Sequence, residues 1–213
     1  MNKKSIFNLL VLCLILLGVS ACGTSSQQKT GFLRDYSKLT PSPYKNAIGS
    51  MAYVNTRTPP ENFEKFILNP VQIRLTQKGK EEGVSRRKMR ELAHYFDKKL
   101  REELRKSDYS VVNRAGPRTM LVRAALTRVE PANPLLNIHP ATIISGIGLG
   151  GASIEAEFLD ALTGEVIVAV MDTQKGSKGF DGFTKYGNAE DVIDRWAKRL
   201  VAQMDDVHGK TRK

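Results

Sequence analysis

The sequence predicts an α+β domain, with a mostly antiparallel sheet of about five strands and two amphipathic helices packed on one face. Segments with alternating apolar residues follow one another without a helix between them, which favours antiparallel pairing. Two longer segments repeat apolar residues every three or four positions. A helix with one such apolar stripe buries it against a sheet.

The first 21 residues have the pattern of an export signal. Lys3 and Lys4 form a positively charged start, and the apolar run Ile6–Leu17 is shorter than the roughly 20 residues that span a bilayer. The segment Val19–Cys22 resembles the bacterial lipobox, in which a cysteine thiol accepts diacylglycerol. We therefore expect cleavage before Cys22 and a stable lipid anchor on it, because each buried methylene contributes about 0.8 kcal/mol. The alternative is an ordinary secretory signal followed by a chance cysteine.

The chain beyond residues 1–21 divides into three parts. Residues 22–30 are the expected lipid-bearing cysteine and a flexible polar tether, 31–208 a single α+β domain, and 209–213 a basic tail. Gly23 stands where an aspartate would favour retention in the inner membrane of two-membrane bacteria. The sequence thus predicts a periplasm-facing lipoprotein of the outer membrane.

Composition restricts the partners and cofactors of the mature chain. The whole chain has 33 basic and 22 acidic residues, and removal of the signal takes away two lysines and no acid, which leaves a net charge of +9. No disulfide is expected, since Cys13 leaves with the signal and Cys22 carries lipid. With three histidines and no free cysteine, the common zinc ligands are scarce, and we predict no metal or other cofactor.

An irregular arm and two short strands are expected before the first helix. Residues 32–53 are rich in Pro and Ser and form the arm, which ends in the candidate strand Met51–Val54. Phe66–Leu75 is predicted to be a strand, because its apolar residues alternate after Pro70. Proline has no backbone N–H to donate, and this is tolerated near the start of a strand. The helix that follows has Ser85 as its expected N-cap and a mostly basic outer face. Its apolar stripe contains Met89, Leu92, Ala93, Phe96, Leu100 and Leu104.

Four more strand candidates and a second helix complete the predicted domain. The strands are Tyr109–Asn113, Thr119–Val129, Ser153–Asp160 and Glu165–Thr173. The last two are expected to form a hairpin across Ala161–Gly164. The second helix has Asn188 as its expected N-cap and Asp191 at the capping-box position. Its buried stripe contains Val192, Ile193, Trp196, Leu200 and Met204.

The glycine-rich segment Gly146–Gly151 fits the pattern G-x-G-x-x-G of dinucleotide-binding loops. That pattern binds a pyrophosphate only when it follows a strand and opens a helix. Here the residues after Gly151 alternate like a strand, so we expect a loop whose glycines permit close backbone approach. Apolar residues between 135 and 149 either pack under the sheet or form a surface patch for a partner or the membrane.

Paired carboxylates are the main candidates for catalysis. Glu155 and Glu157 lie two residues apart on one strand face, a spacing that invites comparison with glycoside hydrolases. Alternation alone, however, places such charges on a solvated sheet face. Two histidines, His94 on the first helix and His139 in a loop, have no partner that would make them metal ligands, so we expect them to be structural or solvated. The sequence therefore predicts a protein that is not an enzyme.

The loop of residues 174–187 mixes cations with aromatic rings. Its candidate partner-binding residues are Lys175, Lys178, Phe180, Phe183, Lys185 and Tyr186. Cations beside rings suit glycans and anionic polymers. Nucleic acid has similar chemistry, but an exported protein does not meet cytosolic nucleic acid. The alternative is a loop whose aromatic residues cap the core.

Five short motifs carry a family resemblance. They are Gly31–Leu39, Asn69–Val71, Val122–Thr127, Glu155–Asp160 and Thr163–Glu165. Together they resemble an uncharacterised bacterial lipoprotein family catalogued as domain of unknown function 3313. This resemblance implies no activity and brings no catalytic residues. The order of elements is also similar to anticodon-binding-like periplasmic lipoprotein domains, some of which activate cell-wall synthases.

These observations favour a non-enzymatic binding or scaffolding module of the cell envelope. Its expected partners are the membrane, through the lipid on Cys22, and an anionic envelope polymer, lipid or envelope protein. Two alternatives stay open, an activator of a cell-wall synthase and a glycan hydrolase built on Glu155 and Glu157.

Overall fold

The computed structural model describes residues 27–42, 48–133, 148–176 and 184–210. Cys22 lies outside these ranges, as do Lys178, Phe180 and Phe183 of the candidate loop. The same holds for His139 and for the first two residues of the glycine-rich segment. The roles expected of these residues stay predictions.

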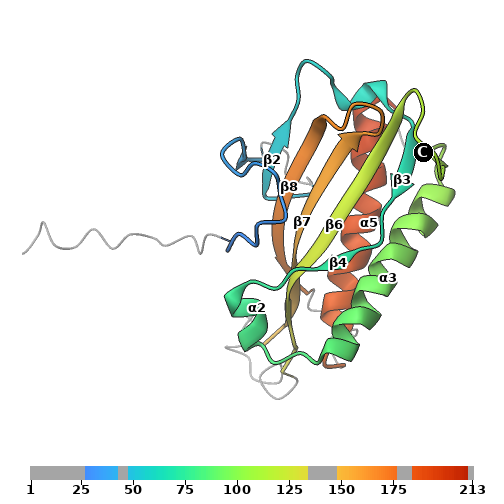
Figure 1. Cartoon of the computed structure of the whole chain (residues 1–213). Coiled ribbons are helices and arrows are strands. Elements are labelled where there is room, and N and C mark those ends of the chain that lie inside the picture. The colour runs from blue at the N-terminus through green and yellow to red at the C-terminus, as the bar shows by residue number, and fades with distance from the viewer. Residues whose placement is uncertain (1–26, 43–47, 134–147, 177–183, 211–213) are drawn as a thin grey trace, which may run out of the picture.

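The described residues form one eight-stranded sheet with the two long helices on one side (Figure 1). The sheet order is β1-β2-β8-β7-β6-β3-β5, and β4 also pairs with β6. The strands are β1 Thr40–Pro41, β2 Met51–Val54, β3 Lys65–Leu68, β4 Gln72–Ile73, β5 Ser110–Val111, β6 Thr119–Glu130, β7 Gly151–Asp160 and β8 Val166–Lys175. The helices are α2 Gln77–Glu81, α3 Arg86–Arg105 and α5 Gly187–Val207, with a 3-10 turn, η1, at Pro60–Asn62.

The α+β class is confirmed, but the prediction of a mostly antiparallel sheet of about five strands is wrong. The sheet is mixed, because β6 pairs antiparallel with β7 and parallel with β3 and β4. Helix α3 lies between β4 and β6 in the chain and returns it in the same direction, which produces parallel pairing. The strand predicted across Phe66–Leu75 is split in two at Asn69-Pro70, and two-residue strands such as β1 are too short for alternation to reveal.

Helices α3 and α5 cover one face of the sheet, as expected (Figure 1). All residues predicted for their two apolar stripes are buried. Ser85 is the N-cap of α3, and its hydroxyl accepts a hydrogen bond from the backbone N–H of Lys88 at 3.2 Å. The rings of Phe96 and Trp196 meet between the helices with centroids 5.9 Å apart.

The N-cap predicted for the second helix is wrong. Tyr186 precedes α5 without a side-chain cap, whereas Asn188 is buried inside the first turn. The Asn188 amide instead donates to the backbone carbonyl of Leu149, which ties the helix to the loop before β7. An N-cap pattern does not distinguish an amide that caps its own helix from one that bonds a neighbouring loop.

Close backbone packing accounts for the described part of the glycine-rich segment. Gly150 has a φ of +70°, and a Cβ there would lie 2.7 Å from the backbone nitrogen of Ala132. Gly151 begins β7, and a Cβ on it would collide with the carbonyl oxygen of Gln174. A strand rather than a helix follows, so the structural context of a dinucleotide loop is missing.

A buried hydrogen bond joins the helix layer to the sheet. The indole N–H of Trp196 on α5 donates to the carboxylate of Asp172 on β8 at 2.8 Å. Both residues are buried, and the same carboxylate accepts from the backbone N–H of Ser50 at 3.1 Å and from Gln174 at 2.5 Å. A buried carboxylate depends on such donors, because removing one leaves its charge poorly solvated.

We predict that Trp196→Phe lowers the free energy of unfolding by about 2 to 4 kcal/mol, because it deletes a donor to Asp172 and leaves a cavity. Urea denaturation followed by circular dichroism measures this change. The control is Leu162→Ala at a side chain 62% exposed, which should stay within about 0.5 kcal/mol of the unaltered protein. Equal stability of the two variants would contradict the stabilising role of the hydrogen bond between Trp196 and Asp172.

Candidate functional site at the docked arm

The second face of the sheet is covered by residues 27–39, which we call the arm from here on and which begin within the predicted tether. Phe32 and Leu33 are buried against Ala125 of β6 and Met171 of β8. In Figure 1 the arm lies on the side of the sheet opposite α3 and α5. The expected irregular arm packed on the domain is therefore present in the described residues.

Glu155 on β7 is completely buried beneath this arm. Its carboxylate accepts hydrogen bonds from the backbone N–H of Thr30 at 2.9 Å and from the Thr30 hydroxyl at 2.7 Å. The Tyr36 hydroxyl donates to it at 2.6 Å. The neighbours of Glu155 on the adjoining strands are Ala125 and Met171, whose side chains have no hydrogen-bond donor. The donors named here all belong to the arm.

Glu157 is buried two residues further along the same face. It accepts from the backbone N–H of Arg34 at 2.5 Å and from the guanidinium of Arg123 at 2.7 Å. Arg123 is its cross-strand partner on β6, and the same guanidinium lies 4.9 Å from the ring centroid of Phe32. The Arg34 guanidinium is 3.9 Å from Glu157 and donates to the carbonyl of Gly164 at 2.8 Å.

The expectation that alternation places Glu155 and Glu157 on a solvated face is wrong. Alternation correctly assigns them to the face opposite Ile154 and Ala156, but it does not report whether another segment covers that face. The arm covers that face, although it lies about 120 positions earlier in the chain. The two carboxylates therefore hold the arm and do not line an open cleft.

Tyr36 organises the tip of the arm. Its hydroxyl oxygen accepts from the backbone N–H of Gly31 at 2.9 Å and of Leu33 at 3.3 Å, while its proton goes to Glu155. Burial and the neighbouring Glu155 raise the pKa of Tyr36. The phenol thus stays protonated and keeps donating across the neutral range.

Contacts between the arm and the rest of the domain begin before residue 31, where the domain was predicted to start. The Gln27 amide donates to the carbonyl of Ile154 at 2.9 Å, and the Gln28 side chain accepts from the backbone N–H of Lys78 at 3.1 Å. Residues 27–30, which were assigned to the tether, therefore bond to β7 and α2.

Sequence reasoning missed Thr30, Arg34, Tyr36 and Arg123 as site residues. A signal was nonetheless present, because four of the five short motifs meet at this junction. Arg34 and Tyr36 belong to Gly31–Leu39, Arg123 to Val122–Thr127, the two glutamates to Glu155–Asp160, and the acceptor of Arg34 to Thr163–Glu165.

The described part of the candidate loop packs partly on the core. Tyr186 is half-buried against the core cluster, and the ammonium groups of Lys88 and Lys185 lie 5.1 and 5.7 Å from its ring centroid. Lys175 and Lys185 are exposed. For Tyr186, this arrangement matches the alternative of an aromatic residue that caps the core. His94 is exposed on α3.

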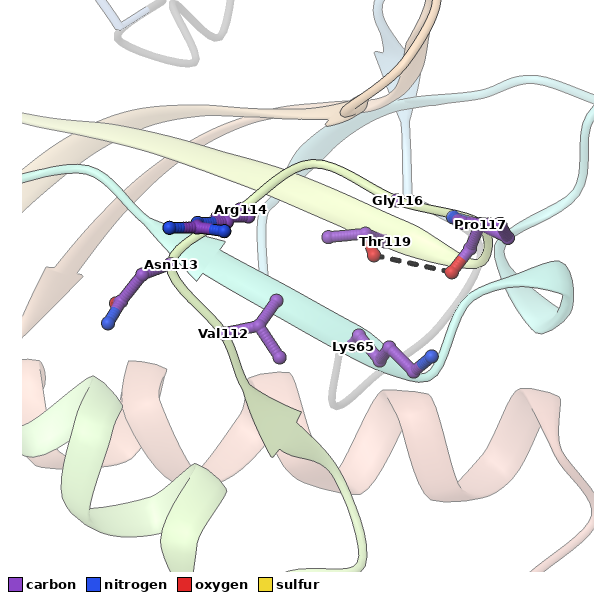
Figure 2. Close-up of a pocket in the computed structure, with 7 residues that line it drawn as sticks. All are labelled: Lys65, Val112, Asn113, Arg114, Gly116, Pro117 and Thr119. Carbon is purple, nitrogen blue, oxygen red and sulfur yellow. Dashed lines mark hydrogen bonds between the residues drawn. The ribbon is translucent and has the colours of Figure 1, made fainter.

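A shallow hollow of about 460 Å³ lies at the sheet edge near β3 and the turn before β6 (Figure 2). It is lined by Lys65, Val112, Asn113, Arg114, Gly116, Pro117 and Thr119. The Thr119 hydroxyl donates to the carbonyl of Pro117 at 3.3 Å, as Figure 2 shows. Its lining contains two cations and no carboxylate or nucleophilic cysteine, so it offers no acid–base pair.

Within the four described ranges, no cluster of three or more His, Cys, Asp or Glu side chains is arranged to hold a metal ion. Nor does any helix in these ranges have the length and apolar character needed to cross a membrane.

The fold and the docked arm define a small α+β domain whose N-terminal segment is part of its structure. The chain belongs to the family described as protein of unknown function (DUF3313), whose model matches residues 28–200 and thus begins within the arm. The predicted family resemblance is confirmed.

Two curated relatives and several solved structures are similar to this chain. The uncharacterized lipoprotein YdcL of Escherichia coli K12 is 23% identical over 212 residues, covering 92% of this chain and 94% of its own, as is YdcL of Escherichia coli O157:H7. A PelC dodecamer from Paraburkholderia phytofirmans matches with a TM-score of 0.41 and 11% identity, covering 70% of this chain and 94% of its own. The hypothetical protein CT253 from Chlamydia trachomatis matches with a TM-score of 0.36 and 13% identity, covering 68% and 96%.

We predict that Tyr36→Phe loosens the arm, because Glu155 loses a donor and two backbone N–H groups lose their acceptor. Amide hydrogen exchange at residues 31–36 should become at least about tenfold faster, which corresponds to about 1.4 kcal/mol of local stability. Tyr53→Phe is the matched control, because no hydrogen bond to the Tyr53 hydroxyl is found in the described structure. Unchanged protection in Tyr36→Phe would show that the hydroxyl does not hold the arm.

Proposed function

We propose that this protein is a lipoprotein of the outer membrane, anchored through Cys22, that acts as a non-enzymatic binding or scaffolding module of the periplasm. The docked arm carries the proposal. Its described part starts at Gln27, five residues after the lipobox cysteine, and is bonded to the sheet from there onward. A lipid on Cys22 would therefore hold the whole domain beside the membrane.

The lipobox and the relatives support the anchor. Val19–Cys22 has the residue types that lipidation requires, and the E. coli relatives that align along almost the whole chain bear the name lipoprotein. Two or three acyl chains give the lasting attachment that a single chain does not. Gly23 in place of an aspartate favours the outer membrane over the inner one.

The use of the two glutamates supports a non-enzymatic role. A retaining or inverting hydrolase needs two carboxyl groups that both face a bound glycan. Glu155 and Glu157 are buried and accept hydrogen bonds from the arm and from Arg123. Freeing them would require the arm to leave the sheet.

Surface charge supports binding of an anionic envelope polymer. The mature chain carries a net charge of +9, and Arg86, Arg90 and Lys98 are exposed along the outer face of α3. A glycan polymer with anionic groups would be attracted to this face, with a strength that falls as salt screens the charges.

Lipidation is tested by Cys22→Ser, expressed in the full precursor. We expect it to abolish metabolic labelling with palmitate and to move the protein out of the outer-membrane fraction of a density gradient, since no thiol remains at the lipobox. Cys13→Ser, which removes the other cysteine, should leave labelling and fractionation unchanged. Labelled, membrane-bound Cys22→Ser protein would refute the anchor.

Polymer binding is tested with purified peptidoglycan sacculi. The detergent-solubilised protein should be retained at low salt and released several-fold at high salt, because the attraction is electrostatic. The triple variant Arg86→Glu, Arg90→Glu and Lys98→Glu should lose retention at low salt as well. Salt-independent retention, or none at low salt, would contradict charge-driven binding. Co-purification of a cell-wall synthase without polymer would favour the activator alternative.

A further inference from the structure

We propose that the arm and α2 form the surface of the domain that lies on the membrane and contacts anionic lipid headgroups. This membrane-facing surface consists of the described residues 27–38 of the arm, α2, and Arg74 just before it. The proposal rests on the proposed anchor at Cys22. It adds which face of the domain meets the bilayer and what chemistry binds there.

Chain length restricts the orientation. Gln27 is five positions after Cys22, and even a fully extended backbone spans at most about 18 Å over that distance. A domain of this size has a radius of gyration of about 16 Å and is roughly 40 Å across. The lipid therefore enters the bilayer close to Gln27, and the short link cannot reach around the domain to place the opposite face on the membrane.

Gln27 lies on the side of the sheet away from the two long helices. Its amide bonds the backbone of β7, and the adjoining Gln28 bonds the first turn of α2. Figure 1 shows the arm and α2 on this side of the sheet and α3 and α5 on the other. The anchor therefore turns the arm and α2 toward the bilayer and the two long helices away from it.

The membrane-facing surface is cationic. It exposes six basic side chains and two acidic ones, Lys29, Arg34, Lys38, Arg74, Lys78 and Lys80 against Asp35 and Glu81. Lys38 is paired with Asp35 at 3.8 Å, and Arg34 reaches Glu157 and the Gly164 carbonyl. Among the described residues, Lys29, Arg74, Lys78 and Lys80 form no ion pair, so their charges remain available to an external anion.

The centre of this surface also supplies hydrogen-bond donors. Gln27, Gln28, Lys29 and Gln77 line a shallow hollow of about 620 Å³ between the arm and α2. Amide and ammonium groups are donors for phosphodiester oxygens. A lysine near an anionic bilayer acts only within about a Debye length, roughly 8 Å at physiological salt. The short link allows these lysines to come that close to the headgroups.

Charge alone would not select this face, because the outer side of α3 is also basic. Arg86, Arg90 and Lys98 are exposed there. The two faces differ in their position relative to the anchor, and this difference makes the orientation testable by a direct comparison between them.

The test places a fluorophore on each face of the lipidated protein in vesicles of phosphatidylethanolamine and phosphatidylglycerol that contain a lipid with a nitroxide headgroup. Gln77→Cys labels α2, and His94→Cys labels the outer face of α3. Both positions are exposed, and neither change removes a lysine or an arginine. Each label is unique, since the only other cysteine of the mature chain carries the lipid. We expect quenching several-fold stronger at position 77 than at position 94.

A charge comparison tests the role of the headgroups. Lys29→Glu, Lys78→Glu and Lys80→Glu together should lower quenching at position 77 by at least half on anionic vesicles. The same change of charge at Arg86, Arg90 and Lys98 should leave it unchanged. Equal or stronger quenching at position 94, or no effect of the first triple variant, would overturn the membrane-facing surface.

Flotation of the same vesicles separates this proposal from the anchor. Protein that floats with the vesicles but shows the wrong pattern of quenching overturns the orientation and leaves the anchor standing. Protein that does not float overturns the anchor at Cys22, and the orientation fails with it. Flotation together with the expected pattern supports both.

Discussion

The burial of two neighbouring carboxylates on β7 is the constraint on which the arrangement of this domain depends. Glu155 and Glu157 are almost without solvent contact, and a buried carboxylate is tolerated only when donors replace the lost water. The arm supplies most of those donors through Thr30, Arg34 and Tyr36. The arm is therefore a structural part of the fold. Its removal would take away the donors of Glu155 named above, while Glu157 would keep the guanidinium of Arg123.

The two faces of the sheet are stabilised by different physics. On one face, α3 and α5 bury apolar stripes around Trp196 and Phe96, where burial of area provides the stabilisation. On the other face, a small apolar cluster around Phe32 is supplemented by directional hydrogen bonds. Directional bonds fix the position of the arm along the sheet more narrowly than apolar contact alone, since they specify individual atoms. This difference suits a segment that connects the domain to the anchor that we propose at Cys22.

Local patterns in the sequence predicted the elements whose stabilisation is local. The stripes of the two long helices, the Ser85 cap and the hairpin of β7 and β8 were all found from spacing. Three features escaped because they depend on distant segments: the parallel pairing of β3 with β6, the bond of Asn188 to Leu149, and the cover over Glu155. Alternation assigned Glu155 to the correct face, but the partner of that face lies about 125 positions earlier in the chain.

That long separation has a consequence for the order of events in the export that we propose. Thr30 and Glu155 are 125 positions apart, so in that export the arm crosses the membrane well before β7. The arm therefore cannot dock until β7 has also crossed. The proposed signal cleavage and acylation at Cys22 have their widest opportunity before the sheet closes on the arm. The speed of folding would thus set the time window in which maturation of the N-terminus is least hindered.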